Sequence, residues 1–291
     1  MSLRLEMLQV ARLAPSVLGE AAELVEGFIR SRNNPDGGFQ DRDGESDLYY
    51  TSFAIDGLTA LGVELPHGDL ERYLRGFGSG GGLDFVHLCC LSRAWSAIDG
   101  EPDDLEAVLA GIEAYRTDDG GYNQKPGAER ATAYGCFLAY GSYSDHRRVV
   151  PQQEARGTCL DALRTPDGAW ANEPGMPQGT APASSAAVAL RRNLRLPIPD
   201  SIGSWFLGCA HPEGGFRAFP AAPMPDLLST AVVLHALDGL QVDFAPLKDS
   251  CLDFVDSLWV NEGGFHGHWA DDELDLEYTY YGLLALGHLS F

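Results

Sequence analysis

The sequence predicts an all-α protein in which amphipathic outer helices alternate with apolar inner helices. Two observations lead to this prediction. A glycine-containing turn followed by a large apolar residue recurs six times, and each turn precedes a helical run with almost no charge. The turns begin at Gly37, Gly81, Gly120, Gly168, Gly214 and Gly263. Their spacing of 39 to 49 residues fits two helices and two connections per repeat.

The first repeat shows the alternation most clearly. Residues 3–14 are predicted to form a short leading helix that ends near Pro15. Ser16 then suits the N-cap of the first outer helix, whose apolar residues recur at helical spacing as far as Ile29. After the turn, residues 47–61 are apolar on nearly every side, which predicts a helix buried all round.

The other five repeats follow the same order. Their predicted outer helices are residues 68–77, 103–116, 151–163, 202–210 and 247–260, and their inner helices are residues 84–98, 129–143, 180–190, 226–240 and 275–289. Six such hairpins can close into an (α/α)6 toroid, because the last repeat then packs on the first. We therefore predict one toroid domain over residues 1–291. Its repeats start near residues 16, 68, 103, 151, 202 and 247, and its inner helices begin at one rim of a central cavity.

Composition excludes several classes of partner. The 291 residues include 20 basic and 42 acidic side chains, which gives a net charge of −22. Such a surface repels phosphate backbones and anionic lipid, so no nucleic-acid binding is expected. No signal peptide or membrane span is apparent, and a cytoplasmic location is expected. The six cysteines form no CxxC pair and are expected to be reduced core residues.

Two helical runs point to a family. Residues 47–62, DLYYTSFAIDGLTALG, and residues 275–289, DLEYTYYGLLALGHL, follow acidic loops and glycine-aromatic turns. With those turns, they resemble the prenyltransferase and squalene-cyclase repeat superfamily, and most closely the β subunits of protein prenyltransferases of the Rab geranylgeranyl type. The resemblance implies an aromatic-lined cavity for an isoprenoid diphosphate, a zinc ion held by Asp, Cys and His, and an α-type partner subunit.

The zinc ligands of that family are not retained in this sequence. The resemblance places them at Asp226, Leu228 and Tyr278, and only Asp226 keeps its family residue. Because Leu228 offers no donor atom, no metal site is predicted, although Zn²⁺ or Mg²⁺ binding stays open. Type II terpene cyclases protonate an alkene with the middle Asp of a DxDD motif, and the matching position here is again Leu228. The predicted catalytic residues are Asp226, Asp275 and Tyr278.

Further polar residues lie in or near the predicted first turns of the inner helices. The predicted substrate-binding residues are Asp47, Tyr50, Asp84, His87 and Glu129. Carboxylates that converge on one cavity raise each other's pKa and can form an acid and base pair. His87 falls three residues after Asp84 on the same helix face, which suggests a base oriented by that carboxylate. The alternative is that each acid only N-caps its helix and complements the helix dipole.

The sequence thus predicts a prenyltransferase β-subunit-like protein that has diverged from zinc-dependent thiol prenylation. Its ligand is expected to be an isoprenoid, including the diphosphate form, or a similar apolar small molecule. Whether the protein is an enzyme stays open, and if it is, a prenyltransferase-like transferase or terpenoid cyclase is expected. Three alternatives remain: a type II terpene-cyclase-like enzyme without the DxDD acid, a non-catalytic toroid that binds lipid or protein, and a carbohydrate-active toroid enzyme.

Overall fold

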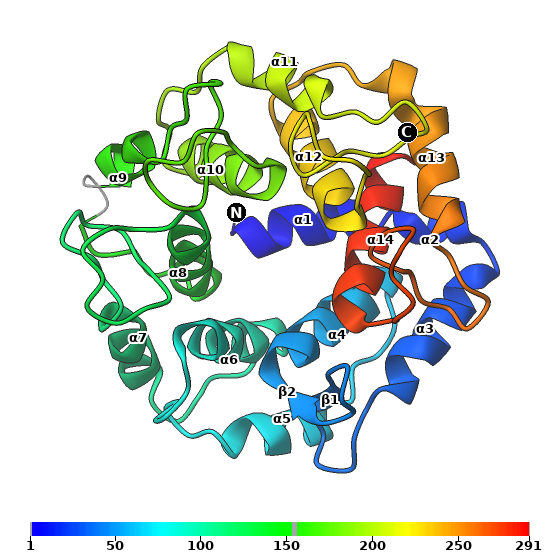
Figure 1. Cartoon of the computed structure of the whole chain (residues 1–291). Helices are drawn as coiled ribbons and strands as arrows, with labels where there is room; N and C mark the ends of the chain where they lie inside the picture. Colours follow the sequence, from blue (N-terminus) through cyan, green and yellow to red (C-terminus); the bar gives the residue numbers. More distant parts are fainter. Residues whose placement is uncertain (1, 153–155, 291) are drawn as a thin grey trace.

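The computed structural model describes residues 2–152 and 156–290, which form two concentric rings of helices (Figure 1). The inner ring consists of α4 (Leu48–Leu61), α6 (Phe85–Ala97), α8 (Ala133–Asp145), α10 (Ala181–Asn193), α12 (Leu227–Gly239) and α14 (Leu276–His288). The outer ring consists of α3 (Ala21–Ser31), α5 (His67–Arg75), α7 (Leu105–Glu113), α9 (Arg156–Ala162), α11 (Ser201–Gly208) and α13 (Lys248–Ser257), with the short 3-10 helix η2 (Ala245–Leu247) before α13.

The ring is closed. Each inner helix packs on the inner helices of the preceding and following repeats, and α14 of the last repeat packs on α4 of the first. This arrangement confirms the predicted α/α toroid. Apolar residues on all sides of the inner helices form the core between the two rings. No helix in the described ranges is long and apolar enough to cross a membrane.

The glycine-aromatic turns connect each outer helix to the next inner helix. In five of them the large residue is an aromatic that pairs by a β-bridge with a residue six positions earlier, as Phe216 does with Ala210. These aromatics are Phe39, Tyr122, Trp170, Phe216 and Phe265, and each is at most 1% exposed. The Phe216 amide donates to Thr230 Oγ1 in α12 at 2.8 Å. The turn therefore fixes the start of the inner helix.

One glycine shows why the turns tolerate no side chain. Gly214 has a φ of +100°, and a Cβ there would lie 1.9 Å from the backbone oxygen of Ser250 in α13. The turn of one repeat thus contacts the outer helix of the next repeat directly. In the first repeat the turn is extended by a small antiparallel pair, β1 (Phe39–Gln40) and β2 (Ser46–Asp47).

The N-terminal segment differs from the prediction. The leading helix α1 (Leu3–Ala11) is followed by a separate short helix, α2 (Ala14–Leu18). Ser16 lies inside α2, where its hydroxyl donates to the Leu13 carbonyl oxygen at 2.6 Å, so the prediction of Ser16 as the N-cap of the first outer helix was wrong. Pro15 is tolerated because it occupies the first turn of α2.

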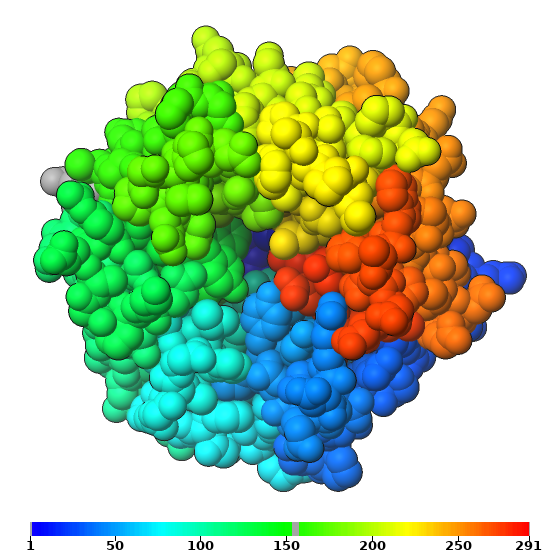
Figure 2. Space-filling model, viewed as in Figure 1, coloured from blue at the N-terminus to red at the C-terminus, as the bar shows by residue number. Residues whose placement is uncertain are grey.

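The leading helix α1 lies inside the ring, against α4, α8 and α14 (Figure 1). Arg4 Nε donates to Asp56 Oδ1 of α4 at 2.6 Å, and Arg192 Nη1 of α10 donates to Glu6 Oε1 at 2.5 Å. Asp56 and Arg192 belong to the later turns of their helices. Helix α1 therefore closes the end of the ring at which the inner helices end, and Figure 2 shows its atoms deep within the central hollow.

Candidate functional site

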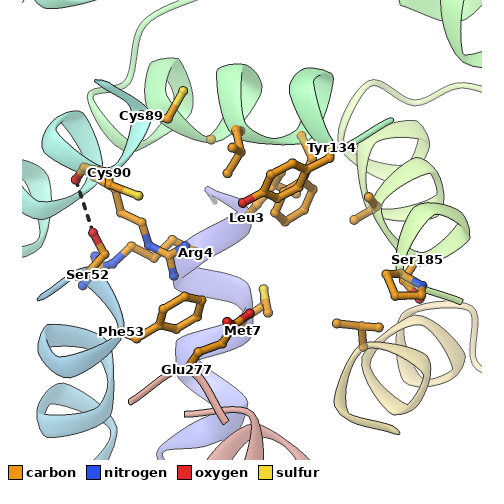
Figure 3. A pocket seen from close by; sticks show the side chains of 18 of the residues that line it. Leu3, Arg4, Met7, Ser52, Phe53, Cys89, Cys90, Tyr134, Ser185 and Glu277 are labelled. Atoms are coloured by element: carbon orange, nitrogen blue, oxygen red, sulfur yellow. Dashed lines mark hydrogen bonds between the residues drawn. The ribbon is translucent and has the colours of Figure 1, made fainter. Parts of the chain in front are cut away.

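A cavity of about 380 Å³ occupies the centre of the ring (Figure 3). Its wall comes from all six inner helices and α1, and it is mainly aliphatic and aromatic. From Tyr134 in the first turn of α8 to Asp145 at its end, both of which line the cavity, the helix rises by about 16 Å. The cavity is thus a deep apolar pocket that opens at the rim where the inner helices begin and ends on α1.

The lining residues form three layers because they recur along each inner helix at intervals of one turn. The mouth layer consists of Tyr49, Tyr134, Pro182, Leu228 and Glu277. The middle layer consists of Ser52, Phe53, Cys89, Cys90, Phe137, Leu138, Ser185, Ala186, Val232 and Tyr281. The floor consists of Arg93, Gly141, Ser142, Asp145, Ala189 and His235, together with Leu3, Arg4 and Met7 from α1. Charged and polar groups therefore lie at the two ends, and the middle is mostly apolar.

Aromatic rings form one side of the cavity wall. The ring centroids of Tyr49 and Phe53 are 5.0 Å apart in an edge-to-face arrangement, and those of Phe53 and Tyr281 are 5.6 Å apart. Phe53 and Tyr134 both appear beside the cavity in Figure 3. Such faces carry partial negative charge and stabilise a cation held against them.

Glu277 is the ionisable residue of the mouth layer whose pKa is shifted into the neutral range. It lies in the first turn of α14, and the Tyr49 hydroxyl donates to its Oε1 at 2.7 Å. Burial in the apolar cavity raises the pKa of Glu277 to about 7, although the hydrogen bond from Tyr49 opposes this shift. Both protonation states are therefore populated near neutral pH, and Glu277 can give or accept a proton inside the cavity.

Four predicted acidic residues are N-caps of inner helices. Asp47, Asp84, Asp226 and Asp275 each accept hydrogen bonds from backbone amides of the first helical turn, as Asp226 Oδ1 does from Ser229 N at 2.7 Å. Among the described residues that line the cavity, these four do not appear. Burial nevertheless raises the pKa of Asp226.

Asp275 also accepts hydrogen bonds from Arg42, which reaches it from the loop between β1 and β2. The distance from Arg42 Nη2 to Asp275 Oδ2 is 2.7 Å, and Arg42 forms further ion pairs with Asp271 and Glu273. The Arg42 guanidinium also lies over the ring of Tyr278, 5.8 Å from its centroid. The rim at α14 is thus tied to the first repeat through Arg42 rather than open to the cavity.

Tyr50 and Glu129 have different surroundings from the capping acids. Tyr50 is half-buried in the first turn of α4, next to the cavity-lining Tyr49. Glu129 is exposed and precedes α8, because that helix begins at Ala133 with Thr132 as its N-cap. The predicted start of this inner helix at residue 129 was therefore four residues early, and the first-turn position belongs to Tyr134.

His87 connects the first turns of α4 and α6. Its Nε2 is 2.8 Å from Asp47 Oδ2, and its Nδ1 is 2.9 Å from Asp84 Oδ1. The hydrogen bond with Asp47 is the main cause that raises the pKa of His87 to about 9, and Asp84 adds to it. His87 is thus an imidazolium at neutral pH, with no lone pair available to act as a base.

This geometry predicts a pH-dependent contribution of His87 to stability. Because its pKa in the folded protein is raised above the unfolded value, the contribution is complete below about pH 6.5 and is lost as the pH rises through about 9. We expect His87→Gln to lower the free energy of unfolding by about 0.5–1 kcal/mol at pH 6, since the site is half-exposed, and by less at pH 10. Urea unfolding of both proteins at the two pH values measures this difference, and an equal loss at both would contradict it.

The residues at the family zinc positions do not fit a zinc ion. Leu228 lines the cavity without a donor atom, Asp226 is engaged as a cap, and Tyr278 packs below Arg42. Within residues 2–152 and 156–290, no group of three or more His, Cys, Asp and Glu side chains is placed to hold a metal. We therefore derive no chemical step through a metal.

The protein is therefore a helical toroid with a deep apolar central cavity. The family model of the prenyltransferase alpha-alpha toroid domain matches residues 10–75, 28–154 and 184–290, and the chain belongs to this family. No curated protein is similar enough in sequence to count as a relative.

Three solved structures show the same fold at low sequence identity. The type II terpene cyclase MstE from Scytonema has a TM-score of 0.63 and 12% identity, over 94% of this chain and 97% of that one. Candida albicans protein geranylgeranyltransferase-I complexed with GGPP has a TM-score of 0.66 and 12% identity, over 92% and 90%. A glycosidase variant has a TM-score of 0.60 and 13% identity, over 97% and 98%. At these identities the similarity shows the fold alone.

In α4, α12 and α14 the predicted site residues lie one or two positions from the residue of the mouth layer. In five of the six inner helices the cavity-lining residue lies two positions after the N-cap, and Glu277 is such a residue after Asp275. Sequence reasoning selected the caps themselves and residues three positions after them, including Tyr278. The family resemblance contained one indication of the cavity-lining position. Leu228, which stands at a zinc-ligand position of the family, also lies two positions after its N-cap, Asp226.

Proposed function

We propose that this protein binds an isoprenoid or a similar long apolar molecule in its central cavity. The observation that carries the proposal is the mainly aliphatic and aromatic lining of the 380 Å³ cavity, which is interrupted in the middle layer by the small side chains of Ser52, Cys89, Cys90 and Ser185. A sugar would leave its hydroxyl groups without partners against this wall, so the apolar lining favours an apolar ligand over a carbohydrate. Two solved structures with this fold are complexes with such molecules, a variant of the terpene cyclase MstE with geranylgeranyl dihydroxybenzoate and the protein geranylgeranyltransferase-I with GGPP, which agrees with such a ligand.

The charge at the rim argues against a diphosphate group held at the mouth. The capping carboxylates Asp47, Asp84 and Asp226 lie around it. Two cations at this rim are already paired, His87 with Asp47 and Asp84, and Arg42 with three acids. A diphosphate would face net repulsion there. This supports divergence from classical thiol prenylation and favours a ligand whose end at the mouth is uncharged.

Glu277 favours a second candidate, a proton-initiated reaction of the type II terpene-cyclase kind. Its carboxyl group lies at the mouth of a cavity with aromatic walls and holds its proton into the neutral range. Transfer of that proton to an alkene carbon would form a C–H bond and leave a carbocation on the neighbouring carbon. The rings of Phe53 and Tyr281 would stabilise that cation, and its later loss of a proton to the Glu277 carboxylate would restore an alkene and the acid. Asp226, Asp275 and Tyr278, at the starts of α12 and α14, stay predicted catalytic residues beside it.

Native mass spectrometry tests the binding proposal. The protein is mixed with farnesol, geranylgeraniol and their diphosphates, each without metal and with Zn²⁺ or Mg²⁺, and we expect one-to-one complexes with the alcohols. Ala186→Trp, which fills the middle layer, should abolish them, whereas Ala110→Trp on the exposed face of α7 should not. Absence of any complex, or equal binding by Ala186→Trp, would reject an isoprenoid in this cavity.

A further inference from the structure

Four ionisable residues from four different helices lie at the floor of the cavity or directly behind it. Arg4 comes from α1, Asp56 from α4, Arg93 from α6 and Asp145 from the end of α8. Asp56 is fully buried behind the two arginines, and it accepts a hydrogen bond from Arg4 Nε on Oδ1 and one from Arg93 Nη2 on Oδ2. Arg4, Arg93 and Asp145 all line the cavity, and Figure 3 shows Arg4 at its wall.

These groups leave hydrogen-bonding capacity without a partner among the described residues. Asp56 is one carboxylate shared between two guanidinium groups. Arg93 Nε and Asp145 Oδ1 are buried, and neither has a hydrogen-bond partner among the described residues. Such orphaned buried groups are costly, and the cost falls when a ligand supplies the missing partner. Burial also raises the pKa of Asp145, which favours its neutral, protonated form, and that form can donate a hydrogen bond.

We propose that the floor is a subsite for a single anionic head group, a carboxylate attached to the apolar chain that fills the rest of the cavity. This proposal rests on the proposed function. Arg4 and Arg93 lie near two carboxyl groups, Asp56 and Asp145, and with Asp145 in its protonated form the subsite carries one uncompensated positive charge, which matches a carboxylate rather than a diphosphate. The planar fork of Arg93 suits a carboxylate, and its side chain is 21% exposed, on the cavity side.

The subsite orients the ligand. With the carboxylate at the floor, the apolar chain extends through the middle layer and its far end lies at the mouth, beside Glu277 and about 16 Å away. The reacting end and the anchored end are therefore opposite ends of the molecule. Because Arg4 belongs to α1, the floor is complete only while α1 is docked in the ring.

Ligands that share an apolar chain but differ in their head group distinguish binding at this subsite from binding by the apolar cavity alone. Isothermal titration calorimetry at about pH 8 compares farnesoic acid, farnesol and methyl farnesoate, and hexadecanoic acid with hexadecanol. We expect the acids to bind about 10- to 100-fold more tightly than the alcohols or the ester, the range for a hydrogen bond to a charged group. Arg93→Gln should remove this preference, so that the variant binds the acid and the matching alcohol with equal affinity.

Arg192→Gln is the control variant. It removes the other ion pair of α1, with Glu6, and does not touch the cavity. If both variants lose the acid preference equally, Arg93 acts only through the docking of α1 and the proposal fails. Equal binding of acid and alcohol by the unmodified protein would also overturn it while leaving the proposed function standing. If no ligand binds, both proposals fail.

Discussion

Asp56→Ala is expected to destabilise the protein by about 3–5 kcal/mol, the cost of removing one partner from a buried ionic network. Asp56 is fully buried and is the carboxylate that both Arg4 and Arg93 contact directly. Its removal leaves two guanidinium groups in the interior without that counter-charge. It also breaks the contact between α1 and α4, so the end of the cavity should open as α1 loses its place. Urea unfolding measures the loss of stability, and hydrogen exchange of α1 measures the undocking.

An exposed ion pair provides the control for this prediction. Asp103 is 75% exposed and lies 2.6 Å from Arg75, so Asp103→Ala should cost less than about 1 kcal/mol. The two variants remove the same type of side chain and the same type of contact. If they lost equal stability, the Arg4, Asp56 and Arg93 network would contribute no more than a surface pair, and its role as the anchor of α1 would have to be given up.

Glu277→Gln is expected to stabilise the protein at pH 8 and to abolish any turnover that depends on Glu277. Burial raises the pKa of Glu277 to about 7, above the value of about 4.5 in an unfolded chain. The stability that Glu277 contributes is therefore largest below about pH 4.5 and is lost as the pH rises to about 7. At pH 8 the buried carboxylate is ionised at a cost of about 1–3 kcal/mol, which glutamine does not incur.

Unfolding at pH 5 and pH 8 tests this prediction. The difference between Glu277→Gln and the unmodified protein should be larger at pH 8, because Glu277 is already mostly neutral in the folded protein at pH 5. Glu213→Gln, at an exposed turn position, is the control for the loss of one carboxylate. A loss of stability at pH 8 would mean that the hydrogen bond from Tyr49 to the carboxylate outweighs the cost of burying the charge.

The fold could be predicted from the sequence because the patterns that specify it are local. The repeated turn needs glycine where φ is positive, and the aromatic after it is buried wherever the unit occurs, as Phe216 and Phe265 show. N-capping is also local, since Asp84 accepts a hydrogen bond from the backbone amide of His87, only three residues later. These short-range requirements leave a pattern in the chain itself, and six repeats of it predict a closed ring.

The site was harder to predict from the sequence because it depends on the rotation of each inner helix about its own axis. Neighbouring residues in a helix point about 100° apart, so a one-residue difference separates Glu277, which lines the cavity, from Tyr278, which packs below Arg42. Inner helices that are apolar on nearly every side give no hydrophobic face from which to find this rotation. Only the packing of α14 between α4 and α12 sets it.

The sequence alone therefore determined the repeat, the alternation of outer and inner helices, and four caps of inner helices, Asp47, Asp84, Asp226 and Asp275, because each depends on interactions within a few residues. The tertiary structure decided which residues meet. It placed α1 inside the ring, joined Arg4, Asp56 and Arg93 from three separate helices, and buried Glu277 where its pKa rises to about 7. These features depend on contacts between residues far apart in the chain, such as Tyr49 and Glu277, which are 228 positions apart, and no local pattern records them.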